Sequence, residues 1–129
     1  MNMICNRVIF LSLILCCSCM NMDNRGQADV WKKVGVDLSN VDHDGLRGPA
    51  DGKVAVSYEF CIPDTPEHRA AVRAIDPTVQ VMPGSRGRIG ASIGQCLCIG
   101  STHQKNYKAV LRSLSNLPYI ERIIECYFE

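Results

Sequence analysis

The sequence lacks an apolar run long enough to span a bilayer, and it lacks an excess of charge of either sign. Its 129 residues include 14 basic and 13 acidic side chains, whereas a nucleic-acid-binding domain needs a clustered basic surface. The longest apolar run, Val8–Leu15, is far shorter than the roughly 20 residues of a membrane-spanning helix. We therefore expect neither a nucleic-acid partner nor a spanning segment.

Motifs with zinc-binding or catalytic spacing are also missing. The sequence has no paired C-x-x-C motifs of the kind that structural zinc sites use. His68 and His103 are each expected in the first turn of a helix, at opposite ends of a sheet. Neither a Ser-His-Asp nor a Cys-His arrangement can be assembled from them. A small enzyme is therefore the last of our hypotheses about function.

The first nineteen residues have the pattern of an export signal. Arg7 precedes the run Val8–Leu15, and the cysteine cluster 16–19 follows it; one charge before a short apolar run is typical of secretory signals. Because it ends in cysteines rather than in an Ala-x-Ala site, the segment resembles a bacterial lipoprotein signal. That resemblance implies acylation of Cys19, after the small residue Ser18, or alternatively of Cys16 or Cys17. An ordinary cleaved signal with incidental cysteines is the other interpretation.

Residues 20–52 are polar and rich in turn-forming residues. We interpret them as a tether, with one short ordered piece at Val30–Val36. A flexible tether would let a lipid-anchored domain stand away from the bilayer.

Part of this segment has the spacing of a calcium-binding loop. It resembles an EF-hand or dockerin loop, in which oxygen ligands at alternate positions surround the ion and a glycine permits the turn. The resemblance implies calcium ligands at Asn40, Asp42, Asp44 and Asp51. The first position is Asn rather than Asp, the last is Asp rather than Glu, and Pro49 argues against a flanking helix. A solvated Asp-Gly turn is the alternative, and apart from calcium we expect no cofactor.

Residues 53–129 have the pattern of one folded domain. Alternation of apolar residues over 54–62 predicts a half-buried strand. Thr65 and Pro66 are typical of a helix start, and this helix ends before Asp76-Pro77. A second helix is expected to open with a capping box at Ser101–Gln104 and to end at Pro118. Further strands are expected over 78–82, 95–100 and 119–129, the last with Ile124, Cys126 and Phe128 facing the core.

The resulting order, βαββαβ, predicts an α+β fold of the ferredoxin-like split-βαβ class. Right-handed crossovers would give an antiparallel sheet of order 4-1-3-2 with both helices on one face. In the segment Tyr107–Glu125, a helix runs through a Leu-Pro-x-Ile-Glu turn into the last strand. This segment is similar to the same region of subtilisin-type propeptides and their inhibitor relatives. That resemblance implies an alternative function as a peptidase inhibitor or propeptide-like protein.

The loop over 83–94 is rich in glycine and carries two arginines. Accessible backbone N–H groups next to guanidinium groups can hold a phosphate, carboxylate or sulfate. The expected topology places this loop at the end of the sheet where the first helix presents its positive N-terminus. The predicted anion or partner site comprises Arg86, Gly87, Arg88, Gly90, Thr65 and His68. A plain hairpin loop is the alternative.

Four cysteines lie in the predicted domain, and export would permit disulfides. In the strand register that we expect, Cys61 lies close to opposite Cys96, and both point away from the helices. We therefore predict the disulfide Cys61–Cys96, with Cys98 as the alternate partner. Cys126 is expected to act as a small apolar core residue. The competing interpretation is four reduced thiols used for packing.

Taken together, these patterns predict an exported, lipid-anchored binding module without catalytic activity at the bacterial cell envelope. Its expected partner is a protein or a small anionic ligand, since loops on a rigid scaffold are where binding residues concentrate. The membrane contact is expected through the N-terminal lipid alone.

Overall fold

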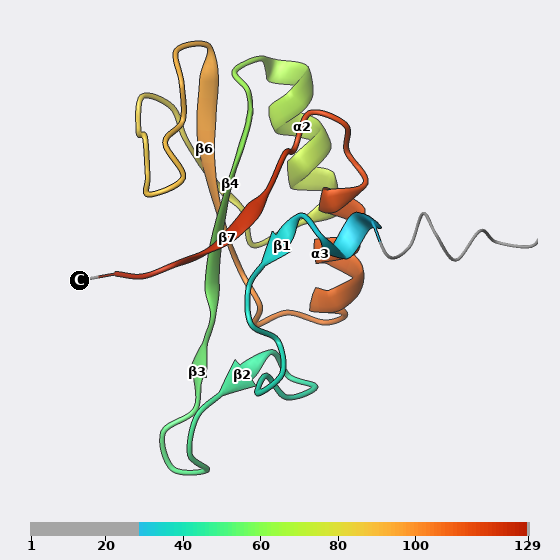
Figure 1. The fold of residues 1–129 in the computed structure, drawn as a ribbon, viewed down its shortest axis with the longest axis vertical. Helices are drawn as coiled ribbons and strands as arrows, with labels where there is room; N and C mark the ends of the chain where they lie inside the picture. Colours follow the sequence, from blue (N-terminus) through green and yellow to red (C-terminus); the bar gives the residue numbers. More distant parts are fainter. Residues whose placement is uncertain (1–28, 129) are drawn as a thin grey trace, which may run out of the picture.

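The computed structural model describes residues 29–128, which form two sheets and helices that cover one face of the larger sheet (Figure 1). The larger sheet contains, in spatial order, β1 (Val34–Gly35), β7 (Ile123–Cys126), β4 (Ser57–Pro63), β6 (Gln95–Ser101) and β5 (Gln80–Met82). The smaller sheet pairs β2 (Leu46–Arg47) with β3 (Val54–Ala55). Helices α2 (Pro66–Ile75) and α3 (Tyr107–Ser115) pack on this sheet.

The predicted fold class is wrong, because the larger sheet is mixed and has a fifth strand. β1 pairs in parallel with β7, with Val34 opposite Ile123, whereas the other pairs in this sheet are antiparallel. The structure is therefore not an antiparallel ferredoxin-like sandwich of order 4-1-3-2. A two-residue strand is too short to show the alternation that reveals strands in a sequence. For the same reason, β3 was not separated from β4 in the expected strand over 54–62.

The start of α2 follows the capping chemistry that the sequence indicates. Thr65 has extended backbone angles, and its hydroxyl accepts a hydrogen bond from the His68 backbone N–H at 3.2 Å. Pro66 occupies the first helical turn, where its missing N–H costs no hydrogen bond. The helix ends at Ile75, and the backbone N–H of its C-cap residue, Asp76, donates to the Val72 carbonyl.

The start of α3 differs from the expected capping box. Ser101 belongs to the end of β6, and the helix begins six residues later, at Tyr107. Its N-cap is Asn106, which has a left-handed backbone (φ 56°). Gln104 is used elsewhere: its amide donates to the Ser101 carbonyl, at 2.8 Å, and to the Asp76 carboxylate, at 3.1 Å. A buried acceptor therefore outcompetes the local cap for this side chain.

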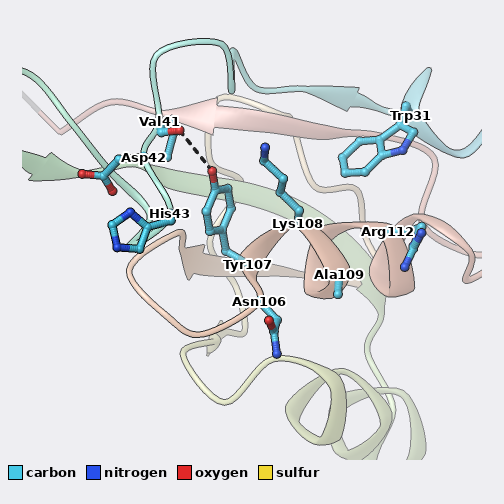
Figure 2. Close-up of a pocket in the computed structure, with 9 residues that line it drawn as sticks. All are labelled: Trp31, Val41, Asp42, His43, Asn106, Tyr107, Lys108, Ala109 and Arg112. Atoms are coloured by element: carbon cyan, nitrogen blue, oxygen red, sulfur yellow. Dashed lines mark hydrogen bonds between the residues drawn. The ribbon is translucent and has the colours of Figure 1, made fainter.

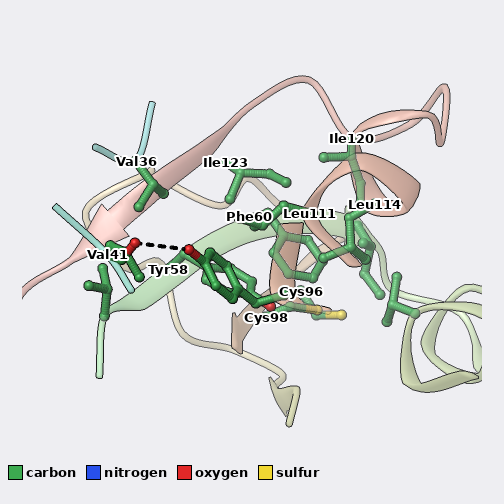
Figure 3. Packing of buried hydrophobic residues seen from close by; sticks show 14 residues of the cluster. Val36, Val41, Tyr58, Phe60, Cys96, Cys98, Leu111, Leu114, Ile120 and Ile123 are labelled. Atoms are coloured by element: carbon green, nitrogen blue, oxygen red, sulfur yellow. Dashed lines mark hydrogen bonds between the residues drawn. The ribbon is translucent and has the colours of Figure 1, made fainter. Parts of the chain in front are cut away.

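The hydrophobic core lies between the sheet and its two helices (Figure 3). The core side chains of the two central strands are Tyr58, Phe60 and Ile62 from β4 and Cys96 and Cys98 from β6. The helices and the chain after them contribute Val72, Leu111, Leu114, Ile120 and Ile123, all fully buried.

The face of β7 that enters the core is the opposite of the expected one. Ile123 is fully buried, whereas Ile124 and Cys126 are only half-buried and Phe128 is 73% exposed. Ile124 lies opposite Glu59 of β4, on the face of the sheet that the helices do not cover. Because the strand contains two adjacent isoleucines, its alternation alone does not reveal which of them faces the core.

The chain before residue 53 also belongs to the fold, which corrects the tether expected over 20–52. Val36 and Val41 are buried in the core cluster. Gly45 lies so close to Thr102 that a Cβ at this position would come within 1.7 Å of the Thr102 carbonyl oxygen. The buried Thr102 hydroxyl also donates to the Gly45 carbonyl at 2.6 Å. Residues 20–28 of the expected tether lie outside the described residues.

Candidate functional site

A groove of about 620 Å³ lies along the first turns of α3 (Figure 2). Small-molecule sites typically have volumes of about 300–1,000 Å³. The lining residues come from three parts of the chain: Trp31 in the described start of the chain, residues 41–43 before β2, and residues 106–109 and 112 of α3 and its N-cap.

Aromatic and cationic side chains share the central part of this groove. Trp31 is half-buried and packs against the core, and Tyr107 is 3% exposed. Lys108 and Arg112 are exposed and lie four residues apart on α3, so they share one side of the helix. In Figure 2, Lys108 extends into the space between Tyr107 and Trp31, and its Nζ lies 6.0 Å from the centre of the Tyr107 ring.

The carboxylate in the groove wall is already used by the protein. Asp42 accepts hydrogen bonds from Lys53 Nζ at 2.7 Å and from the backbone N–H groups of Asp44 and Leu46. The ion pair with Lys53 and these backbone donors lower the pKa of Asp42 to about 2. Since Lys53 neutralises Asp42, the two cations of α3 dominate the charge of the groove.

The groove is held in shape by contacts between its two walls. The Tyr107 hydroxyl donates to the Val41 carbonyl at 3.3 Å, which joins the start of α3 to the chain before β2 (Figure 2). Burial raises the pKa of Tyr107, so its phenol stays protonated and keeps this donor role at neutral pH. Trp31 is placed by the short helical segment that precedes β1, which is itself anchored to β7.

Sequence reasoning missed this groove because it placed Trp31 in a short ordered piece, and residues 41–43 in the flexible part, of a tether that was not expected to contact the domain. Two signals could have indicated it. Trp31 is the single tryptophan of the chain, placed within a polar segment. Lys108 and Arg112 lie at helical spacing beside the apolar stripe that begins at Tyr107, which marks a basic edge on an amphipathic helix.

The predicted anion site around the loop 83–94 is only partly assembled. The loop does pack against the start of α2: the Asp64 backbone N–H donates to the Gly94 carbonyl at 2.9 Å, and Arg86 and Asp64 line one shallow depression. Thr65 and His68, however, bond to each other at 2.6 Å, and His68 packs edge-on against the Tyr119 ring. These side chains are therefore used within α2 and against Tyr119, and neither lines the depression that Arg86 shares with Asp64.

Glycines and Arg88 in the loop serve to cover the sheet. Gly87, with φ +62°, lies against Leu97 and Glu59, and the Ile89 backbone N–H donates to Glu59 Oε1 at 2.7 Å. Arg88 lies over the Tyr127 ring, 5.5 Å from its centre. The loop therefore folds back over the face of the sheet that the helices leave open (Figure 1).

The calcium-loop residues are arranged as a turn. Asp42 Oδ1 accepts from the Asp44 and Leu46 backbone N–H groups, and Gly45 has the positive φ that the turn requires. Over residues 29–128, no group of three or more His, Cys, Asp or Glu side chains is arranged to hold a metal ion. Asn40 and Asp51 are exposed residues on either side of this turn. Calcium binding here stays a prediction.

The register behind the predicted disulfide is wrong by one residue. Cys61 lies opposite Leu97, and Cys96 lies opposite Ile62. Because side chains alternate along a strand, Cys61 is on the open face and Cys96 and Cys98 are in the core. Cys61, Cys96, Cys98 and Cys126 are all free thiols. The more hydrophobic Leu97 and Ile99 had been assigned to the core, but the loop 83–94 covers that face.

The predicted lipid-attachment cysteines, Cys16, Cys17 and Cys19, lie outside the described residues. In the part of the chain from 29 to 128, no helix is long and apolar enough to cross a bilayer. No protein-family model, curated protein or solved structure matches this chain. The groove is therefore interpreted from its own side chains.

Proposed function

We propose that this protein is an exported, lipid-anchored binding module without a catalytic step, and that its ligand occupies the groove along α3. The observation that carries the proposal is the placement of Trp31 beside Lys108 and Arg112 in a cavity of about 620 Å³. An aromatic ring next to two cations fits a small ligand that carries an anionic group beside a planar or apolar part.

Each part of the ligand would meet a matching part of the groove. A planar or apolar part would lie against Trp31, where an aromatic contact adds about 0.5–1.5 kcal/mol beyond the buried area. Carboxylate, sulfonate or phosphate oxygens would face Lys108 and Arg112. Arg112 makes no ion pair with another residue of the described chain, so its guanidinium has donors to offer.

The proposed anchor would keep this groove close to a membrane. Trp31 follows Cys19 by twelve residues, and a chain of that length spans at most about 43 Å. A lipid on Cys19 would therefore hold the groove within that distance of the bilayer surface. Ligands that are released from or held at the membrane surface would be within its reach.

The binding test uses Trp31 fluorescence, because this tryptophan is the single one in the chain. Anilinonaphthalene sulfonate is the anionic aromatic probe, and the uncharged N-phenylnaphthylamine is its matched control. We expect quenching of Trp31 by both dyes, with tighter binding of the sulfonate. The variant K108Q/R112Q should lose about tenfold in sulfonate affinity, about 1.4 kcal/mol, and little for the neutral dye.

A control variant separates local charge from net charge. R86Q/K105Q removes two cations that do not line the groove, so its net charge equals that of K108Q/R112Q. It should bind both dyes as the unmodified protein does. Equal losses in the two double variants, or no loss in K108Q/R112Q, would reject the groove as the anion site.

The anchor is tested separately from the groove. Replacement of Cys19 by Ser should abolish acylation and release the protein from the membrane fraction, because one buried acyl chain contributes about 0.8 kcal/mol per CH₂. C16S and C17S are the matched variants and should stay in that fraction. If C16S or C17S releases the protein instead, that cysteine carries the lipid. Retention of all three would contradict the lipoprotein assignment.

A second candidate function, peptidase inhibition, is favoured by the chain that follows β7. Tyr127 and Phe128 are 57% and 73% exposed, and β7 pairs only as far as Cys126. An exposed extended segment beside a sheet is a form in which a chain can enter a protease cleft.

Inhibition of a subtilisin-type protease tests this candidate. The variant Y127A/F128A should lose it, whereas V54A, at an exposed site on β3, should retain it; no inhibition by the unmodified protein would reject this candidate.

A further inference from the structure

The core face of β6 holds two cysteine thiols side by side, and neither belongs to the groove. Cys96 and Cys98 lie two residues apart on one strand, so both point to the helices, and both are fully buried (Figure 3). Burial raises the pKa of both thiols, and each lies close enough to the other to influence its ionisation. This arrangement forms a pair of sulfur atoms beneath α2, which we call the core dithiol.

The strand geometry disfavours a disulfide within the core dithiol. Residues i and i+2 of a strand have Cα atoms about 6.4–6.8 Å apart, at the upper limit of the 4.4–6.8 Å that disulfides tolerate. A bridging ion relaxes this limit, since two metal–sulfur bonds of about 2.3 Å allow the sulfurs to lie up to about 4.6 Å apart. The pair is thus better spaced to share an ion than to bond directly.

Two arginines of α2 supply positive charge next to the core dithiol. The Arg69 guanidinium pairs with Asp64 at the surface, and its charge also acts on the Cys96 thiol. Arg73 follows four residues later, and its charge acts on Cys98. Arg69 is half-buried, with a side chain 30% exposed, whereas both thiols are fully buried.

We propose that Cys96 and Cys98 form a two-coordinate site for a soft monovalent cation, such as Cu(I) or Ag(I), with Arg69 balancing its charge. Thiolates select soft ions of this kind. On binding, two S–H bonds break, two metal–sulfur bonds form, and two protons leave to solvent. No atom changes oxidation state, and the bis-thiolate complex carries one net negative charge beside Arg69.

The charge balance favours a monovalent over a divalent ion. A divalent cation on two thiolates would be neutral and would leave the adjacent guanidinium without a new partner. It would also need further ligands, since zinc in proteins is almost always four-coordinate. No third cysteine, histidine or acid joins the pair within residues 29–128. This favours an ion that binds stably with two sulfur ligands.

The test uses Ag(I), which needs no reductant, and the full-length chain in detergent with Cys5, Cys16, Cys17 and Cys19 replaced by serine. Calorimetry and native mass spectrometry should find one tightly bound ion per chain. C96A/C98A should lose it, and each single variant should weaken binding by about a hundredfold or more, because the second sulfur acts at high effective concentration. C61A/C126A, which removes the two half-buried thiols, should bind as before.

Two further measurements keep the proposal falsifiable if C96A/C98A fails to fold. In C61A/C126A, silver X-ray absorption should show two sulfur neighbours; one sulfur, or nitrogen and oxygen neighbours, would overturn the proposal. R69M should fold with both thiols intact and bind Ag(I) about tenfold more weakly. Full binding in C96A/C98A, or an unchanged affinity in R69M, would likewise contradict the assigned site or the role of Arg69.

Discussion

The two faces of the larger sheet each bury a carboxylate, but they satisfy and cover it in different ways. On the helix face, the fully buried Asp76 accepts from the Tyr58 hydroxyl, the Gln104 amide, and the backbone N–H and hydroxyl of Thr78. On the open face, Glu59 is 2% exposed and accepts from the Ile89 backbone N–H. The first carboxylate is held by three residues from separate parts of the chain, the second largely by one loop.

The two faces also differ in the structure that covers them. Helices α2 and α3 exclude water from the helix face, and their apolar side chains interdigitate with those of β4 and β6. The open face is covered by the loop 83–94, which has no regular secondary structure and contacts the sheet through its backbone and through Gly87. Loops open locally at lower free-energy cost than packed helices. We infer that the helix face determines stability and that the open face tolerates change.

The largest expected loss of stability follows from Gly100→Ala on the helix face. A Cβ at Gly100 would lie 2.5 Å from Asp76 Oδ2 and 2.5 Å from the Tyr58 ring. Relief of this clash would separate the carboxylate from its donors, at a cost of about 3–5 kcal/mol for overpacking together with a broken buried network. Thermal or urea unfolding measures the loss.

Gly35→Ala is the matched control for this substitution. The new Cβ in β1 would meet nothing closer than the Ile123 carbonyl oxygen, at 3.4 Å. We expect its effect on stability to stay within about 0.5 kcal/mol, as for surface substitutions in general. If G100A were as stable as G35A, the Asp76 network would contribute little and the contrast between the two faces would fail.

A smaller loss is expected from Gly87→Ala on the open face. The residue has φ +62°, and a Cβ there would lie 2.8 Å from a Leu97 methyl and 3.0 Å from Glu59 Oε2. Backbone strain and the displaced loop should together cost about 2 kcal/mol. Gly90→Ala has a similar positive φ, +79°, but open space around its Cβ, so it should cost about 1 kcal/mol. Equal losses would show that the loop does not press on the sheet.

Local signals predicted the elements whose pattern is contained in one stretch of chain. The N-cap of α2 at Thr65 is determined by residues that are neighbours in sequence, and the structure confirms it. The start of α3 was missed because the Gln104 amide reaches Asp76, which lies 28 positions earlier in the chain. A long-range partner of this kind cannot be recognised before the fold that supplies it.

The faces of β6 and β7 were missed for a related reason. Alternation assigns residues to two sets but does not say which set enters the core. Leu97 is more hydrophobic than Cys96 and Cys98, so it was expected inside. It is in fact 3% exposed on the open face, because the loop covers it. The groove was missed because Trp31 reaches its position through β1, whose two residues carry no pattern.

Thiols on the two faces should also contribute differently to the loss of folding stability at alkaline pH. Burial and the neighbouring Cys96 raise the pKa of Cys98 to about 12, from 9.0. The folded state therefore holds this proton more tightly than the unfolded state, so the stabilisation is complete below about pH 9 and is lost as the pH rises toward 12. Urea unfolding between pH 8 and 11 should show a steep loss in the unmodified protein.

Cysteine variants locate that pH dependence. Cys98→Ala should make the decline above about pH 9 less steep, because one of the protons that link pH to folding is gone; the raised pKa of the buried Tyr58 keeps part of the decline. Burial also raises the pKa of Cys126 on the open face, but this thiol is only half-buried. Cys126→Ala should therefore leave the decline steeper than C98A does. The reverse order would place the dominant thiol on the open face.

Only a small effect on stability is expected from Arg86→Ala combined with Arg88→Ala, both on the open-face loop. The two side chains are exposed, and the contact of Arg88 with Tyr127 is a cation–π contact worth about 0.5–1 kcal/mol at an exposed site. The melting temperature should fall by no more than about 4–8 °C, as expected for a loss of about 1 kcal/mol in a domain of this size. A large loss of stability would show that the loop arginines hold the loop against the sheet.

The same double variant also tests the position of the anion site. The sulfonate dye should bind as tightly as before if the groove is the anion site, because neither arginine lines it. A loss of sulfonate binding with unchanged stability would instead show that the anion binds at the loop, and K108Q/R112Q, measured in parallel, would then bind the dye normally.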